Sequence, residues 1–306
     1  MADDTEVATA GLSGRELPSL SNPPVLDGFP TLPLMKRRLG AVFWVSCGWV
    51  GLIILSAIFA GALPLHNPLA QTYMPKLGPS LAHPLGTDEL GRDLLSRVIY
   101  GARVSLEVGF GSIVLGLSVG GSAGLLAGYL RGKIDAIANG MANIILSFPT
   151  LLLLLAIVGF WGRQWWKITI IIGVVSTAPL FRVVRASTLS YSTREFVTAA
   201  RAIGASHWRI MTRELLPNVL PAALSIGLIA VAIAIVAEGT LSFLGLSVPP
   251  PTPTWGNIIA EGQSSLARSD FLITLWPSLA MFMTLLALNL AGDRLQRYFD
   301  VREGRL

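Results

Sequence analysis

The sequence predicts an all-α polytopic membrane protein with six transmembrane helices. Hydrophobic residues make up 52% of the chain and charged residues only 13%, against roughly 25% charged in a typical soluble domain. The mean hydropathy is +0.62. Six apolar runs approach or exceed the roughly 20 residues that a helix needs to cross the hydrocarbon core. They cover about 41–63, 105–130, 140–160, 168–187, 219–244 and 271–292.

The first run follows Lys36-Arg37-Arg38 and could therefore begin a secretory signal peptide. At about 23 residues it is longer than a secretory h-region, and no small-residue cleavage pattern follows it. Cys47, the single cysteine, lies too early in the run to be a lipoprotein anchor, and one cysteine allows no internal disulfide. We therefore predict a true transmembrane helix.

The third and fourth runs contain Pro149 and Pro179. Proline is tolerated in spanning helices because neighbouring helices and polar groups satisfy the carbonyls that it frees. We therefore expect both runs to cross as helices.

The distribution of Lys and Arg predicts the topology. With a cytoplasmic N-terminus, 16 of the 23 Lys and Arg residues fall in inside segments and 7 in outside segments. This bias fits the positive-inside rule with both termini cytoplasmic. It also accounts for the net charge of +5 without nucleic acid. Residues 1–35, rich in Pro, Ser, Gly and acid, are predicted to be a flexible cytoplasmic tail, and 294–306 a second cytoplasmic tail.

The segment 64–104 is too polar to cross and is predicted to lie outside. From Leu90 on, its apolar residues recur at helical spacing, which indicates an amphipathic helix at the outer interface leading into the second span. Thr87 or Asp88 is expected to cap that helix.

Glycines recur every four residues in the second span. This spacing puts them near one helix face, where the missing side chains allow a second helix to approach closely. We expect a packing face made of Gly116, Gly120, Gly124, Gly128 and Gly132.

Glu238 lies within the fifth span, where a charge is costly and suggests a functional site. It could line a translocation path, or pair structurally with a neighbour or a partner subunit. The other polar candidates for lining such a path are Ser147, Thr177 and Ser225.

No catalytic, cofactor or metal site is predicted. The stretch GYLRGKI is one residue short of a phosphate loop, and Ile134 stands where Ser or Thr is required. His66, His83 and His207 are dispersed in loops, without an H-E-x-x-H pattern. Asp88 and Asp93 fit turn and capping roles better than a metal site or an acid pair. The chain is therefore expected to be a secondary transporter, a channel, or one subunit of a powered complex.

The charged stretch FVTAARAIGASHWRIMTRELLPN, residues 196–218, interrupts the apolar pattern. Its first part is helix-prone and Gly204 permits a bend or helix end. Ser206 can cap a second short helix, and Pro217 stops it or turns the chain into the fifth span. A bent pair of short helices suits docking into a groove on another protein. An amphipathic loop on the membrane surface is the alternative.

This stretch is similar to the cytoplasmic EAA loop of permease subunits of bacterial ABC importers, whose pattern is E-A-A, three residues, G, nine residues, then I-x-L-P. The matching positions are Thr198-Ala199-Ala200, Gly204 and Glu214-Leu215-Leu216-Pro217. Thr198 replaces the usual Glu, and Glu214 replaces the usual Ile.

Four further stretches resemble the DppC/OppC group, the second permease subunits of dipeptide and oligopeptide importers, over about residues 30–300. They are HPLGTDELGRDLLSRVIYGARVSL, SFPTLLLLLAIV, AEGTLSFLGLSVPPPTPTWGNII and WPSLAMFMTLLALNLAGDRLQ. The resemblance implies a type I ABC importer (MetI-like) permease fold. Its transmembrane domain would cover 102–293 with the EAA loop at about 194–217, preceded by a first helix and outer segment at 36–101.

The resemblance also implies a function. The chain would be a permease subunit that forms the translocation pathway with a second, DppB/OppB-like permease. Two ATP-binding subunits, DppD/DppF- or OppD/OppF-like, would use ATP and Mg in the cytoplasm, and an extracytoplasmic binding protein would deliver the cargo. The expected place is the bacterial inner membrane, in contact with lipid. Nickel, glutathione or haem-like cargo are alternatives to peptides. A stand-alone secondary transporter is a further alternative, although no convincing repeat is visible.

In that family the EAA loop fits a groove of one ATPase subunit. The residues expected to make this contact here are Thr198, Ala199, Ala200, Arg201, Ile203, Gly204, Ala205, Ser206, Arg209, Leu216 and Pro217. The outer segments 64–104 and 245–270 are candidate docking surfaces for the binding protein.

Overall fold

The computed structural model describes residues 39–263 and 271–303, with side chains up to 299. The predicted tail 1–35 lies outside these residues. Within them the regular elements are helices, joined by loops that contain one isolated bridge between Thr87 and Asp93. The predicted tail 294–306 begins inside the last helix, which continues to Glu303.

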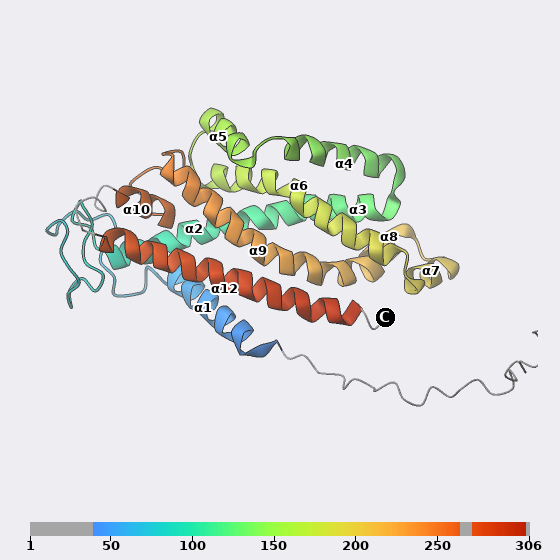
Figure 1. Ribbon diagram of the computed structural model, residues 1–306, viewed down its shortest axis with the longest axis horizontal. Coiled ribbons are helices and arrows are strands. Elements are labelled where there is room, and N and C mark those ends of the chain that lie inside the picture. Colours follow the sequence, from blue (N-terminus) through green and yellow to red (C-terminus); the bar gives the residue numbers. More distant parts are fainter. Residues whose placement is uncertain (1–38, 264–270, 304–306) are drawn as a thin grey trace, which may run out of the picture. The chain divides into compact units, whose positions relative to one another are not determined.

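The helices form a bundle of long rods with short helices at its ends (Figure 1). The rods contain α1 (Gly40–Ile58), α2 (Leu94–Gly116), α3 (Ser122–Leu130), α6 (Trp165–Ser192), α9 (Leu216–Phe243) and α12 (Leu272–Glu303). The remaining helices are α4 (Gly132–Ser147), α5 (Thr150–Trp161), α7 (Glu195–Ala202), α8 (His207–Arg209) and α10 (Trp255–Glu261). Two π-helical segments join neighbours into longer rods: η1 (Leu117–Gly121) between α2 and α3, and η2 (Ile210–Leu215) between α8 and α9.

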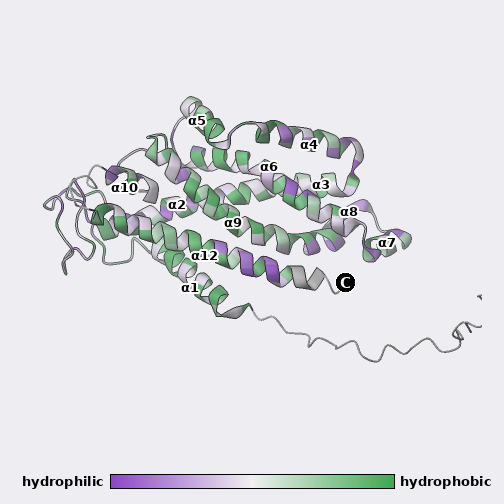
Figure 2. Cartoon of the chain, in the orientation of Figure 1, coloured by the Kyte–Doolittle hydropathy of each residue, from purple (hydrophilic) through white to green (hydrophobic). Residues whose placement is uncertain are grey.

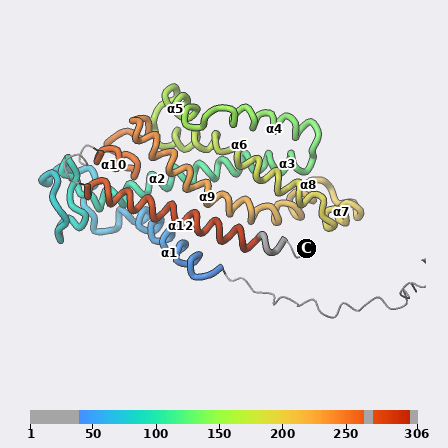
Figure 3. Tube along the Cα trace, in the orientation of Figure 1, coloured from blue at the N-terminus to red at the C-terminus, as the bar shows by residue number. Residues whose placement is uncertain are grey.

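Five helices among the described residues are long and apolar enough to span a membrane, and the α4–α5 pair brings the number to six if it counts as one span. Figure 2 shows apolar residues along the long rods and hydrophilic ones in the later part of α12 and around α7. The helix α1 lies beside α12 (Figure 3) and exposes Trp44 and Val45. Such exposed apolar residues fit a helix that faces lipid or another subunit.

The third expected span, 140–160, is not one helix. The chain bends by 87° between α4 and α5. Phe148 is extended, with ψ 139°, and Pro149 follows it. The prediction of a single crossing helix was wrong here, because proline clashes with a helical conformation of the residue before it and donates no backbone hydrogen bond. Pro179 lies inside α6 as expected.

The second rod begins at Leu94 and runs unbroken to Leu130. The expected amphipathic helix is therefore the first part of α2, and its polar residues Ser96 and Arg97 are buried as well. Its cap is Asp93, whose side chain accepts a hydrogen bond from Ser96 N. The expected cap at Thr87 or Asp88 was wrong, because both residues belong to the turn before the helix.

The glycines of the second rod face α6. A Cβ at Gly124 would lie 2.7 Å from the Phe181 carbonyl oxygen, and one at Gly128 would lie 2.8 Å from Thr188 Cβ. Gly116 and Gly120 meet Leu180 and the Thr177 backbone in the same way.

A four-residue repeat drifts by about 40° per step in an α-helix of 3.6 residues per turn. The wider turn of η1 offsets that drift, and so keeps the glycines on one side. Gly132 does not belong to this face, because the helix ends at Leu130 and nothing lies within 4 Å of the Gly132 Cβ position.

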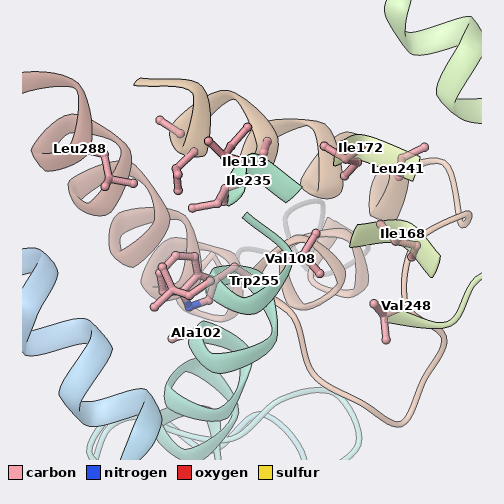
Figure 4. Packing of buried hydrophobic residues seen from close by; sticks show 14 of the residues in the cluster. Ala102, Val108, Ile113, Ile168, Ile172, Ile235, Leu241, Val248, Trp255 and Leu288 are labelled. Carbon is pink, nitrogen blue, oxygen red and sulfur yellow. The ribbon is translucent and has the colours of Figure 1, made fainter. Parts of the chain in front are cut away.

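The main core lies between α2, α6, α9 and α10. Figure 4 shows Trp255 between the helices, near Ala102. The Trp255 side chain is fully buried, and its Nε1 donates to the Val98 carbonyl oxygen at 3.0 Å. Part of the predicted outer loop 245–270 therefore folds back into the bundle.

The two ends of the bundle are built from different elements. The α7 end contains the end of α3, the start of α4, and α7 with α8 (Figure 1). The α10 end contains the segment 59–93, the start of α2, and α10.

Candidate functional site

The turn between α7 and α8 shows why alanines and a glycine occur in this charged stretch. Gly204 has φ +79°, a left-handed conformation that favours glycine. Its N–H donates to the Arg201 carbonyl oxygen at 3.0 Å, and Ala205 N–H donates to the Ala200 carbonyl oxygen at 3.0 Å. This is the Schellman arrangement, in which a glycine after the helix lets two later N–H groups satisfy its last carbonyls.

The residue Ala200 faces inwards, whereas its neighbours face outwards. Ala200 is buried against a cluster that includes Val197, Ile210 and Leu215. Thr198 and Ala199 are exposed. A larger residue fits at 199 but not at 200 without displacing that cluster.

The turn exposes two apolar and two basic side chains. Ile203 is 85% exposed and Trp208 is 71% exposed. Arg201 and Arg209 are also exposed. We call this set of four residues the coupling surface. An exposed isoleucine and an exposed tryptophan within one short charged stretch are typical of a protein-binding surface.

The coupling surface is anchored to α3. Tyr129 Oη lies 3.0 Å from His207 Nδ1, and the Arg201 guanidinium lies over the Tyr129 ring, 5.2 Å from its centre. Ser206 caps the second helix as expected, its side chain accepting from Arg209 N at 3.3 Å. The contacts with Tyr129 therefore fix the coupling surface against the bundle.

The second short helix does not stop at Pro217. The residues His207–Phe243 form one rod of 37 residues through η2 and α9. Pro217 sits in the first turn of α9, where its missing N–H costs little. Trp208 and Arg209 of the coupling surface therefore belong to the same rod as the fifth expected span, whereas Arg201 and Ile203 lie before the Gly204 turn. Leu216 and Pro217 are exposed and lie beyond the turn.

The four polar residues expected along a translocation path lie apart. Ser147 is exposed at the end of α4 and Thr177 is half-buried on α6. Ser225 and Glu238 are fully buried in α9. Whether any of the four lines a path stays a prediction.

The contacts of Glu238 favour the structural alternative. Its carboxylate accepts hydrogen bonds from Ser247 Oγ at 2.6 Å and Ser242 Oγ at 3.0 Å, and Ser105 Oγ lies 3.4 Å away. These hydroxyls come from α9, from the loop after it and from α2. Glu238 therefore ties three parts of the bundle together.

A pocket of 560 Å³ lies behind the coupling surface, between the second rod and the start of α9. Its lining is mostly apolar and includes Trp208 and Met211. The polar residues Ser118, Ser122 and Thr212 also line it. The sequence reasoning missed them, although Ser118 and Ser122 stand at i and i+4 in the glycine-rich span and thus share a helix face.

The α10 end buries charges. Arg92 Nε donates to Asp88 Oδ2 at 2.6 Å, and its Nη2 donates to Glu261 Oε2 at 2.6 Å. Arg97, only 1% exposed, donates to the same Glu261 oxygen at 2.8 Å. Residues 169 positions apart along the chain are thereby joined.

Two of the three histidines are not dispersed in space. His66 and His83 have ring centres 5.0 Å apart. Both lie beside Asp93, while His207 is at the other end of the bundle. The expectation from the sequence was wrong for this pair, because the 59–93 segment folds back onto the start of α2.

Known proteins are similar to this chain over most of its length. A family described as "Binding-protein-dependent transport system inner membrane component" matches residues 120–305. The glutathione transport system permease protein GsiD of Pectobacterium atrosepticum is 36% identical over 73% of this chain and 74% of its own length. The di/tripeptide transport system permease protein DppC of Pseudomonas aeruginosa is 35% identical over 92% of this chain and 94% of its own.

A solved structure also has a similar fold. A chain of the MetNI methionine ABC transporter, in an inward-facing conformation, aligns with a TM-score of 0.56. It is 20% identical, and the alignment covers 67% of this chain and 97% of that one. At this identity the likeness concerns the fold alone.

Proposed function

The chain belongs to the family of inner-membrane components of binding-protein-dependent transport systems, and from that premise we propose how it works. It is a multi-pass permease subunit of an ABC importer, not the subunit that hydrolyses ATP. With a second, DppB/OppB-like permease it forms the translocation pathway for short peptides, and it alternates between outward- and inward-facing states. DppD/DppF- or OppD/OppF-like ATPases supply ATP and Mg chemistry.

The coupling surface is the observation that carries this proposal. Ile203 and Trp208 present apolar area at the tip of the bundle, and an ATPase groove would bury it. Arg201 and Arg209 would meet acids on the groove's rim. Buried aromatic and apolar anchors ringed by charges are the usual centre of a protein interface.

The rod that starts at His207 supports a mechanical role. Trp208 and α9 belong to the same continuous helix of 37 residues. A displacement of Trp208 and Arg209 on ATPase closure would therefore move the whole of α9, because no loop lies between these two residues and α9 to absorb it. This requires the α7 end, and with it both chain termini, to be cytoplasmic, as the Lys and Arg distribution predicts.

The proposed cargo is a short peptide. The names of the relatives refer to di/tripeptides and to glutathione, and glutathione is itself built from three amino acids. Glutathione is the second candidate, favoured by the 36% identity to the GsiD protein. Uptake of a labelled dipeptide by cells that carry the full system, competed with unlabelled dipeptide or glutathione, separates the two. Competition by neither would contradict the peptide proposal.

The coupling proposal is tested with Ile203→Glu and a matched control, Ile134→Glu. Both isoleucines are exposed and lie at the α7 end, but Ile134 is on α4, outside the coupling surface. A charge placed in the interface centre should cost about 2 kcal/mol or more, weakening ATPase binding roughly 30-fold. Co-purification of the ATPases and ATP-driven uptake are measured in complexes with equal amounts of permease. Equal loss in both variants, or in neither, would contradict the proposed surface.

A further inference from the structure

The side chains of His66, His83 and Asp93 converge at the α10 end. His83 Nδ1 lies 2.9 Å from Asp93 Oδ1, and His66 Nδ1 lies 4.0 Å from the same oxygen. One ligand atom from each of the three residues lies within 4.8 Å of the others. In a tetrahedral zinc site with bonds of about 2.0–2.1 Å, ligand atoms are roughly 3.3 Å apart. Small side-chain rotations therefore suffice to bring the three into that geometry.

Hydrogen bonds already orient the carboxylate. Asp93 Oδ2 accepts from Ser96 N at 2.8 Å and from Ser96 Oγ at 2.6 Å. The other oxygen, Oδ1, faces the two histidines. The carboxylate thus has one oxygen fixed by hydrogen bonds and the other free to bind a metal, as metal-bound carboxylates commonly have.

The histidine rings are held as well. The Tyr73 ring packs against both, with centres 4.3 Å from that of His83 and 5.4 Å from that of His66. His83 is buried, while the His66 side chain is 40% exposed. The hydrogen bond to Asp93 explains the position of His83. At 4.0 Å, His66 is too far away for such a bond, although its ring is close to the same carboxylate.

A metal ion bound by these three residues would stabilise the 59–93 segment. The 59–93 segment contains no helix or strand and is held by turns and one bridge. His66 lies near its beginning, His83 in a turn, and Asp93 at the junction with α2. Small loop-rich units without a core of their own are often stabilised by disulfides or metals, and one cysteine allows no disulfide here.

We propose that His66, His83 and Asp93 bind one zinc ion that fastens the 59–93 segment to the start of α2. Imidazole nitrogens and a carboxylate oxygen are ligands that suit zinc. The fourth position lies on the exposed side of His66 and takes water.

Zinc content tests the proposal directly. The full-length chain, carrying a tag without histidine, is stripped with EDTA, equilibrated with zinc chloride and freed of excess metal. The wild-type chain should retain one zinc ion more than His66→Ala. His207→Ala, which removes the histidine at the other end, should retain as much as wild type. His66→Cys restores a ligand and should regain zinc, with a thiolate charge-transfer band when cobalt replaces it.

Proteolysis adds a readout that does not depend on counting metal. A lysine-specific protease cuts after Lys76 inside the segment and after Lys133 at the other end. Zinc at about 100 times its dissociation constant should slow the cut at Lys76 about 100-fold if opening is required. The cut at Lys133, and both cuts in His66→Ala, should not respond. Equal zinc retention by wild type and His66→Ala, with none of this protection, would overturn the proposal.

Discussion

At the α7 end, Ile203 and Trp208 are exposed on short helices, whereas at the α10 end Arg92 and Arg97 are buried beneath an irregular segment. The first arrangement leaves apolar area in contact with water. The second pairs costly buried charges within the subunit, through Asp88 and Glu261. The difference fits the proposal that a partner subunit covers the α7 end, whereas the charges at the α10 end are paired within the chain itself.

The α7 turn and the α10 end also differ in how far apart along the chain their bonded residues lie. The α7 turn is closed by hydrogen bonds between residues at most five positions apart, such as Ala205 to Ala200. The α10 end depends on pairs such as Arg92 and Glu261. Substitutions should therefore affect stability most at the α10 end and coupling most at the α7 end.

The largest expected effect is that of Arg97→Met at the α10 end. It removes a buried cation between Asp88 and Glu261, and breaking a buried ion pair costs about 3–5 kcal/mol. Arg103→Met is the control, because its pairing with Glu107 is exposed and such pairs contribute only about 0–1 kcal/mol. The melting temperature of the purified complex is measured. Similar melting temperatures for the two variants would show that the α10 end is not held by its buried charges.

A smaller loss is expected for Ala200→Leu at the α7 end. Ala200 is on the buried face of α7, and overpacking such a site costs about 1–3 kcal/mol. Ala199→Leu adds the same side chain one position away, where it is exposed, and should leave the melting temperature nearly unchanged. Both are assayed for ATP-driven uptake. If Ala199→Leu melts as low as Ala200→Leu, the inward and outward faces assigned to α7 are wrong.

The smallest expected stability effect belongs to Gly204. Its left-handed conformation costs any other residue about 1–2 kcal/mol, and asparagine less. Nothing lies within 4 Å of a Cβ there, so the Gly204→Glu protein should still fold and insert into the membrane. The added charge should nevertheless uncouple ATP hydrolysis from uptake. Gly204→Asn is the control for backbone strain. Normal uptake by the Gly204→Glu variant, present at the wild-type protein level, would contradict the proposed coupling role of this turn.

Local patterns were sufficient for several features. The Ser206 cap and the bend at Gly204 both followed from residues within a few positions of one another. The Gly116–Gly128 spacing indicated a helix contact, and α6 turned out to be the helix that the glycines face. The same local rules predict a helix break before Pro149. The prediction of one helix instead followed the length of the apolar run around this proline.

Other features could not be predicted from neighbouring residues. Asp93, and not Thr87 or Asp88, caps α2. The Asp88 side chain instead accepts a hydrogen bond from Arg92 N, and the Arg92 side chain pairs with Glu261 of α10. The approach of His66 to His83 depends on how a segment without regular structure folds back. The hydroxyl partners of Glu238 lie on three separate parts of the chain, and local spacing does not indicate them.

The sequence by itself determined the class of protein, all of its spans but the third, and the shape of the α7 turn. These depend on hydrophobic length, helix period and the conformations open to glycine and proline, all of which act over a few residues. Only the tertiary structure decided which charges are buried, which histidines meet and which faces stay exposed. Those outcomes depend on contacts between residues up to 169 positions apart, and local spacing contains no information about such distances.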